Sequence, residues 1–338
     1  MGIIHFLNVN EGDCTWIHHA SGRNTIIDVS AAAAITEFAS ASGNHQQKNY
    51  PVNPIQYLKD FGVSTIFRFI LTHPDMDHMD GMKSLFDSFS ILNFWDTANT
   101  KVIDPNSSWG KYKKEDWEFY QEIRKSDSDP KVLYNYAGAH AKFYNEDEDG
   151  NAGADGLYIL APTKGLVDAA NKSGDYNDCS YVILYKTNNK KIVFAGDSAE
   201  NTWDYILQNH KDDVTDIDIL LAPHHGRSSG KLPTKWLNQI SPKVIVIGEA
   251  DSSMLDYLDV LKPKLTLFGN AKSEYLNYNA WNSRNLDHIT NNQANCIIMD
   301  TFGTNGIDIY VTYEAFAKKR NPKSTYNSTL KAWYIQTV

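Results

Sequence analysis

Side chains that bind metal ions are concentrated in three short loops, and each loop follows a stretch of apolar residues. They are His73, Asp75, Asp77, His78, Asp197, His224 and His225. Imidazole nitrogens and carboxylate oxygens are ligands of zinc, manganese and iron in proteins. Burying so many polar groups behind apolar strands costs free energy unless a cation compensates them. The sequence therefore predicts a metal centre at the ends of these strands.

The spacing of the first four of these residues predicts room for two ions. In extended backbone, residues two positions apart point to the same side, so His73 and Asp75 face one ion. Asp77 and His78 then turn towards a second ion, and the two carboxylate oxygens of Asp197 can bridge the pair. Two ions about 3.5–4 Å apart hold a hydroxide nucleophile and stabilise a phosphoryl group under attack.

The elements that position these loops are those of a mixed α/β protein. An antiparallel meander in each half of the chain predicts two facing sheets. Expected strands cover 3–9, 14–19, 25–28, 64–71, 156–162, 180–185, 191–195, 217–222, 243–248, 295–300 and 306–311. Expected helices cover 31–42, 55–61, 82–89, 108–125 and 200–209. The ligand loops thus come directly after strands, where α/β proteins place catalytic groups.

Composition and charge limit the classes of function. With 338 residues, 42% hydrophobic and 22% charged, the chain suits one large domain or two ordinary ones and is neither disordered nor a coiled coil. Its formal net charge of −9 argues against a broad nucleic-acid surface, although a local basic groove is compatible with it. Cys14, Cys179 and Cys296 are too far apart to predict a disulfide framework or a thiolate zinc site. Without a signal-peptide pattern or a membrane-spanning run, we expect a cytoplasmic protein.

Three motifs occur in order along the chain: His73-Pro74-Asp75-Met76-Asp77-His78-x-x-Gly81, then Gly196-Asp197, then Pro223-His224-His225-Gly226. Together they resemble the metallo-β-lactamase fold superfamily, most closely the domain of ComEC-type competence (DNA uptake) proteins and its stand-alone relatives. The stretches 6–13 and 26–28 also resemble that branch. The resemblance covers about residues 1–90 and 157–250. It implies an αββα sandwich of two facing mixed sheets flanked by helices, with a dinuclear site on its rim and a hydrolase or phosphodiesterase activity.

Two departures from the superfamily pattern change the expected ligands. Asp75 stands where the superfamily has histidine, and the third-motif histidine is replaced by Asn177-Asp178-Cys179-Ser180, as in the ComEC-like branch. More oxygen ligands shift the preference from zinc towards manganese or magnesium, with zinc as the alternative.

By analogy with that branch, the ligands of two divalent ions fall into two groups on either side of Asp197. The first ion lies on His73, Asp75 and either Asn177 or Asp178. The second ion lies on Asp77, His78 and either His224 or His225. Asp77 also orients the bridging hydroxide that attacks phosphorus. For Asn177, an ordinary turn residue is the alternative.

Two further sets of residues have two interpretations each. The set that follows the third motif either holds phosphate oxygens or forms a solvated loop, and consists of Arg227, Ser228, Ser229 and Lys231. An aromatic set either stacks a base or packs an inserted helix, and consists of Trp95, Trp109, Trp117 and Tyr120.

The whole chain predicts one metallo-β-lactamase-like domain over 1–315, with an insertion over about 94–156 and a basic C-terminal tail over 316–338. Its predicted function is a metal-dependent phosphodiesterase or nuclease that acts on nucleic acid or a nucleotide-like phosphodiester. The acidic net charge favours a small nucleotide over long DNA. One alternative is hydrolysis of another small ester or amide, such as a choline phosphodiester or a lactam. The other is a metal-stabilised scaffold that binds a protein partner through the insertion or the tail.

Overall fold

The computed structural model describes residues 2–9, 12–30, 50–226, 240, 242–247, 265–268, 288–290 and 294–338. The predicted helix over 31–42 lies outside the described residues. So do Arg227, Ser228, Ser229 and Lys231, the predicted phosphate-binding set, and the side chain of His225.

The first of two sheets joins the two ends of the chain. In the described residues its ten strands have the order β16-β17-β15-β14-β1-β2-β3-β4-β5-β6. They are β1 (Ile3–Phe6), β2 (Thr15–His18), β3 (Asn24–Ile27), β4 (Thr65–Ile70), β5 (Ser90–Trp95), β6 (Lys131–Leu133), β14 (Ile297–Asp300), β15 (Asp308–Val311), β16 (Tyr326–Asn327) and β17 (Ala332–Thr337). The strands from β3 to β6 pair in parallel, and the other pairs are antiparallel.

The second sheet comes from the middle and later parts of the chain. Its seven described strands have the order β13-β12-β11-β10-β9-β8-β7. They are β7 (Leu157–Ala161), β8 (Val182–Thr187), β9 (Lys190–Phe194), β10 (Ile219–Leu221), β11 (Val244–Ile247), β12 (Leu265–Phe268) and β13 (His288–Thr290). The strands from β9 to β13 pair in parallel. A two-residue turn with positive φ at Asn188 and Asn189 closes the β8–β9 hairpin that the sequence predicts.

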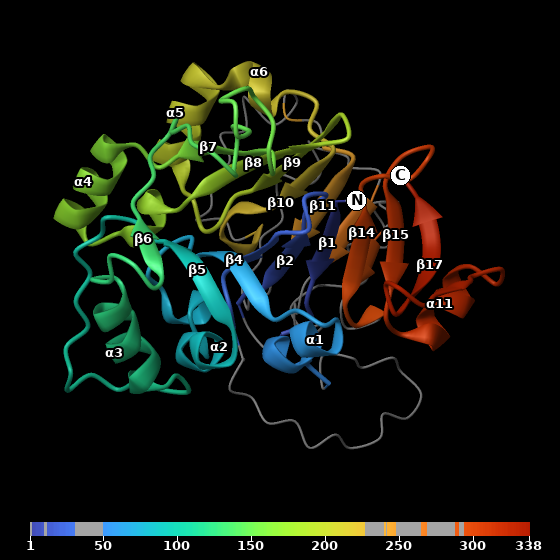
Figure 1. Cartoon of the computed structure of the whole chain (residues 1–338), viewed down its shortest axis with the longest axis horizontal. Coiled ribbons are helices and arrows are strands. Elements are labelled where there is room, and N and C mark those ends of the chain that lie inside the picture. The colour runs from blue at the N-terminus through green and yellow to red at the C-terminus, as the bar shows by residue number, and fades with distance from the viewer. Residues whose placement is uncertain are drawn as a thin grey trace.

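The two sheets lie face to face, with helices on their outer sides (Figure 1). Strands β8 and β9 show why: Ile183 and Phe194 point to the core between the sheets, while Leu184 and Val193 point outwards under α5. A strand buried on both faces is apolar throughout, which is how these strands read in the sequence.

Helices cover both outer faces. The described helices are α1 (Pro54–Asp60), α2 (Met82–Ser88), α3 (Lys114–Ile123), α4 (Lys164–Ser173), α5 (Glu200–Asn209), α6 (Lys211–Val214) and α11 (Glu314–Arg320). Helices α1, α2 and α3 pack on the first sheet through Leu58, Leu85 and Trp117, and α5 packs on the second through Trp203 and Ile206. Three short 3-10 turns carry site residues: η2 (Met76–His78), η3 (Tyr176–Cys179) and η4 (Pro223–Gly226). No helix of the described residues is both long enough and apolar enough to cross a bilayer.

One predicted boundary is wrong. The segment 316–338 is not a tail beyond the domain, because it contributes most of α11 and the strands β16 and β17, and β17 pairs with β15 inside the first sheet. The prediction of a tail followed from the basic residues of this segment and overlooked its apolar residues, which include the buried Leu330, Ala332 and Ile335. Within the predicted insertion over 94–156, β6 pairs with β5 and so extends the first sheet, and the insertion itself stays a prediction.

Candidate metal centre

Parallel pairing brings the ligand loops to one edge of the sandwich. In the first sheet β3 and β4 are parallel neighbours, so Asp28 and His73 follow strands that end side by side. In the second sheet β9 and β10 are parallel neighbours, and Asp197 and His224 follow them. The backbone N–H of Tyr181 donates to the backbone oxygen of Thr72 at 3.0 Å and so links the two sheets at this edge.

Two histidines and one aspartate converge there. Ligand atoms of His73, His78 and Asp197 all lie within 4.8 Å of one another. Nε2 of His78 is 3.3 Å from Oδ1 of Asp197, and Nε2 of His73 is 3.8 Å from Oδ2 of Asp197. Two ligands bonded to one ion at about 2.1 Å in a tetrahedral arrangement lie about 3.4 Å apart. The separations therefore match those of ligands around a shared ion.

The buried Nε2 of His73 also indicates a bound cation. His73 Nδ1 lies 3.1 Å from the hydroxyl of Thr72, which donates its own proton to Asp28, so Nδ1 carries the proton of the ring. Nε2 is buried and has no hydrogen-bond partner in the described part of the chain. An unprotonated nitrogen facing a carboxylate is unfavourable unless a cation lies between them. The donor set thus fits a first-row divalent ion.

Charges within the centre shift the pKa values of both histidines. Burial lowers the pKa of His73, and the neighbouring His78 lowers it further. Burial also acts to lower the pKa of His78, but the carboxylates of Asp197 and Asp28 outweigh it and hold that pKa well above its ordinary value. The two carboxylates therefore attract positive charge to the cluster, which a bound divalent ion supplies in place of a proton.

Asp28 orients His78 from behind. Its carboxylate is buried and accepts the Nδ1–H of His78 at 2.7 Å, together with the backbone N–H and the hydroxyl of Thr72, both at 2.8 Å. The first of these bonds turns Nε2 of His78 towards Asp197. A carboxylate behind a ligand histidine fixes the ring and raises its basicity. No role for Asp28 was predicted from the sequence, although its place at the end of a predicted strand was a usable signal.

We expect Asp28→Asn to weaken binding of a divalent ion about 10- to 100-fold, because the charge that orients His78 is lost. The amide oxygen can still accept from Thr72, so the loop should keep its shape. Competition against a chelating dye measures the affinity. Asp87→Asn removes an exposed carboxylate of α2 that pairs with Lys83 and serves as the matched control. Equal affinities of the two variants would contradict this role of Asp28.

Two glycines allow the loops to approach so closely. Gly196 has a φ of 51°, and a Cβ there would lie 2.9 Å from Cβ of Thr72. Gly12 has a φ of 77°, and a Cβ there would lie 1.8 Å from the backbone oxygen of Asp77. A side chain at either position would push the first motif away from the centre.

The remaining predicted ligands lie at different places around this cluster. Nε2 of His224 is 3.5 Å from Oδ2 of Asp197, and its backbone N–H donates to the oxygen of Gly196 at 3.0 Å. Asp77 lies on η2 and is not a member of the cluster. Asp75 places Oδ2 3.7 Å from Nε2 of His73 and pairs through Oδ1 with the ammonium of Lys101.

The segment expected to supply a third ligand lies on a short turn next to α5. Asn177 and Asp178 lie on η3, just before β8. Oδ2 of Asp178 accepts from Nδ2 of Asn201 on α5 at 2.8 Å, and its backbone oxygen accepts from the hydroxyl of Thr202. The cluster of His73, His78 and Asp197 forms without either residue, so a ligand role for Asn177 or Asp178 stays a prediction.

Most of the aromatic residues of the predicted insertion pack in the hydrophobic core. Trp95, Trp117 and Tyr120 are buried, so the interpretation that they stack a base is wrong and the packing alternative is confirmed for them. Trp109 packs against the same core while only partly buried. Another residue of this region, Tyr112, was missed: burial raises the pKa of its phenol, and the nearby carboxylates of Asp77 and Asp80 raise it further.

No protein-family model and no curated protein matches the chain. Among solved structures, it is similar to Igni18, a metallo hydrolase from the archaeon Ignicoccus hospitalis, with a TM-score of 0.44 and 12% identity over 88% of this chain and 99% of that one. It is similar to CmlA β-hydroxylase with a TM-score of 0.43 and 10% identity over 86% of this chain and 52% of that one. A diphosphatase of the PhnP family gives a TM-score of 0.40 and 10% identity over 85% of this chain and 94% of that one.

At TM-scores below 0.5, the activities of these proteins say nothing about the activity of this chain. The chain's own two facing sheets and outer helices carry the fold assignment. They confirm the predicted architecture of two facing mixed sheets flanked by helices, while membership of the metallo-β-lactamase superfamily and of its ComEC-type branch stays a prediction.

Proposed function

We propose that this protein is a metal-dependent hydrolase whose substrates are phosphodiesters. The observation that carries the proposal is the cluster of His73, His78 and Asp197, with Nε2 of His73 buried and without a hydrogen-bond partner in the described residues. A purely structural polar cluster would satisfy that nitrogen.

Four side chains of this rim are proposed to hold a divalent ion: His73, His78, Asp197 and His224. When bound, such an ion lowers the pKa of water and stabilises negative charge on a phosphoryl group. Asp28 and Thr72 keep the rings of His73 and His78 in the ligand orientation through their Nδ1 atoms. The positive φ of 48° at His224 is held by its backbone bond to Gly196.

Two residues beside the ion site are proposed to act on the substrate. Asp77 lies between the clustered histidines in sequence, on η2, and is the proposed acceptor for a proton of the attacking water. Tyr112 carries its proton at neutral pH, as an ordinary phenol does, and its raised pKa extends this to higher pH, so its hydroxyl can donate a hydrogen bond to an anionic oxygen. Asp197 is thus a proposed ligand, and Asp77 the proposed base.

The phosphodiester class is supported by charge and by the sequence motifs. The ammonium of Lys101 lies beside the cluster, on Asp75, and contributes positive charge where an anionic substrate would bind. The resemblance to the ComEC-like branch points to nucleic acid or a nucleotide. The net charge of −9 favours a small nucleotide over long DNA.

Chelation and metal restoration test this function. We expect protein treated with a chelator to lose hydrolysis of bis-p-nitrophenyl phosphate, and Mn²⁺, Zn²⁺ or Mg²⁺ to restore it. Parallel assays with a dinucleotide, p-nitrophenyl phosphorylcholine and a chromogenic lactam separate the substrate classes. Asp77→Asn should bind the metal and lose most turnover. Turnover of the lactam alone would replace the phosphodiester proposal, and no turnover by metal-loaded protein would favour the scaffold.

A further inference from the structure

A lysine occupies the half of the centre in which the sequence predicts an ion on His73, Asp75 and either Asn177 or Asp178. The ammonium of Lys101 pairs with Oδ1 of Asp75, while Oδ2 of the same carboxylate lies 3.7 Å from Nε2 of His73. The side chain of Lys101 is only 21% exposed. Asp75 therefore already has a cation on the oxygen that is directed away from the histidine.

The neighbouring segment supports the same assignment. Tyr176 opens η3, the turn expected to bring a ligand to the ion on His73 and Asp75, and the Lys101 ammonium lies 5.6 Å from the centre of its ring. An ammonium at this distance from an aromatic ring is stabilised by it. On the same turn, Oδ2 of Asp178 accepts a hydrogen bond from Nδ2 of Asn201 of α5. The turn thus contacts a lysine where the superfamily pattern has a metal-binding histidine.

The backbone on the N-terminal side of Lys101 is fixed by Asn99 and by α4. Asn99 donates to the hydroxyl of Tyr120 at 2.7 Å, and its Oδ1 accepts from the backbone N–H of Lys101 at 3.1 Å. Asn171 of α4 accepts from the backbone N–H of Thr100 at 2.7 Å and donates to the oxygen of Ala98 at 3.1 Å.

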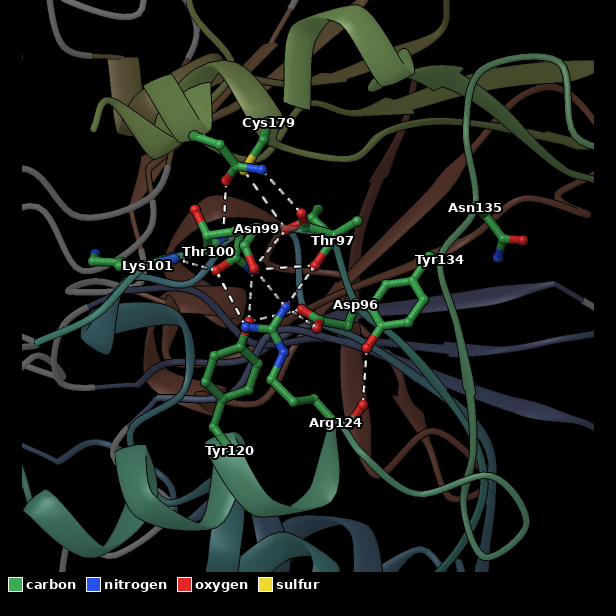
Figure 2. A network of polar contacts seen from close by, with 12 residues as sticks. Asp96, Thr97, Asn99, Thr100, Lys101, Tyr120, Arg124, Tyr134, Asn135 and Cys179 are labelled. Carbon is green, nitrogen blue, oxygen red and sulfur yellow. Dashed lines mark hydrogen bonds and ion pairs between the residues drawn. The ribbon is translucent and has the colours of Figure 1, made fainter. Parts of the chain in front are cut away.

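Arg124, directly after α3, completes this support, as Figure 2 shows. Its guanidinium donates to the backbone oxygens of Thr97 and Asn99 at 3.0 and 2.9 Å and pairs with the carboxylate of Asp96 at 2.9 Å. Because residues 97 to 101 are held by these bonds, the Lys101 side chain extends from a fixed point. The fixed backbone thus keeps the Lys101 side chain within reach of Asp75.

We propose that the centre binds one divalent ion, on His73, His78, Asp197 and His224, and that the ammonium of Lys101 takes the place of the other ion, which the sequence predicts beside Asp75. A divalent ion bound to Oδ1 of Asp75 would have to displace the Lys101 ammonium that pairs with this oxygen. While Lys101 is paired there, Asp75 does not fit the ion that the sequence predicts on His73, Asp75 and either Asn177 or Asp178. This inference rests on the proposed metal-dependent function and sets the number of ions in it.

The stoichiometry of bound metal tests the inference without any assay of turnover. After equilibrium dialysis against Mn²⁺ or Zn²⁺, elemental analysis should find one ion per chain in the wild type. Asp75→Asn should still bind one ion, and Asp197→Asn should bind less than one. Two ions in the wild type, falling to one in Asp75→Asn, would overturn the inference.

Removing the ammonium of Lys101 should allow a second divalent ion to bind beside Asp75. We expect Lys101→Met to bind two ions, and two Mn²⁺ ions should give the exchange-coupled signal of a manganese pair in electron paramagnetic resonance. Lys101→Arg keeps the charge and should bind one. Lys83→Met removes the lysine of an exposed pair on α2 and is the matched control. One ion in Lys101→Met protein with a wild-type unfolding midpoint would overturn the inference.

The outcomes separate this inference from the proposed function. A wild-type chain that binds one ion and hydrolyses none of the substrates would contradict the function and leave the role of Lys101 supported. A chain that binds two ions and hydrolyses a phosphodiester would do the reverse.

Discussion

Asp197→Ala is expected to abolish metal-dependent hydrolysis of bis-p-nitrophenyl phosphate. The Nε2 atoms of His73, His78 and His224 lie between 3.3 and 3.8 Å from the carboxylate of Asp197. The substitution therefore removes the one carboxylate that faces all three histidine rings. A bound ion is worth several kcal/mol of transition-state stabilisation, so we expect a loss of about 10³-fold or more in kcat/KM.

Thermal unfolding separates a lost ion from a lost fold. A ligand present at 100 times its Kd stabilises a protein by about 2.7 kcal/mol, so Mn²⁺ should raise the Tm of the wild type and leave that of Asp197→Ala unchanged. Asp87→Ala, on the exposed face of α2, should behave as the wild type in both measurements. An Asp197→Ala variant that keeps the metal-induced rise in Tm would contradict the central place of this carboxylate.

Arg124→Met is expected to lower the free energy of unfolding by about 3–5 kcal/mol at pH 8, because it leaves the buried carboxylate of Asp96 without its ionic partner. The loss should be smaller at pH 5. Burial raises the pKa of Asp96 to about 6 even though Arg124 favours the charged form, so without Arg124 the pKa in the folded chain rises further.

The sign of this pH dependence follows from linkage. A carboxyl whose pKa is higher in the folded than in the unfolded chain stabilises the fold below the unfolded value, and that contribution is lost as the pH rises through the folded value. Urea unfolding at pH 5 and pH 8 measures the difference. Asp96→Asn combined with Arg124→Met should recover part of the stability at pH 8. Equal losses of Arg124→Met at both pH values would contradict this account of the pair.

The sequence alone was enough to predict the rim of the sandwich. His73, His78, Asp197 and His224 each follow a continuous apolar stretch, and such stretches became strands buried on both faces. Parallel neighbours end at the same edge, so residues about 150 positions apart meet there. The sequence shows polar residues directly after apolar stretches. This order can be recognised from local periodicity alone, without knowledge of the tertiary fold.

The positions of Lys101 and Asp28 could not be predicted from local sequence patterns. Lys101 lies in an irregular stretch, and its position depends on Arg124, Asn99 and Asn171, which come from separate parts of the chain. Asp28 is an ordinary aspartate after a short strand until His78 packs against it. Likewise, β17 was predicted as part of a tail because its alternation is short and follows a basic helix, and only its pairing with β15 identifies it as a strand of the sheet.

The most direct measurement of the central claim is anomalous diffraction from crystals grown with Mn²⁺ or Zn²⁺, recorded at the absorption edge of the ion. Our account predicts a peak bounded by Nε2 of His73, Nε2 of His78 and the carboxylate of Asp197, about 2.0–2.2 Å from each if the ion is zinc. A fully loaded crystal without a peak at these three side chains would contradict it.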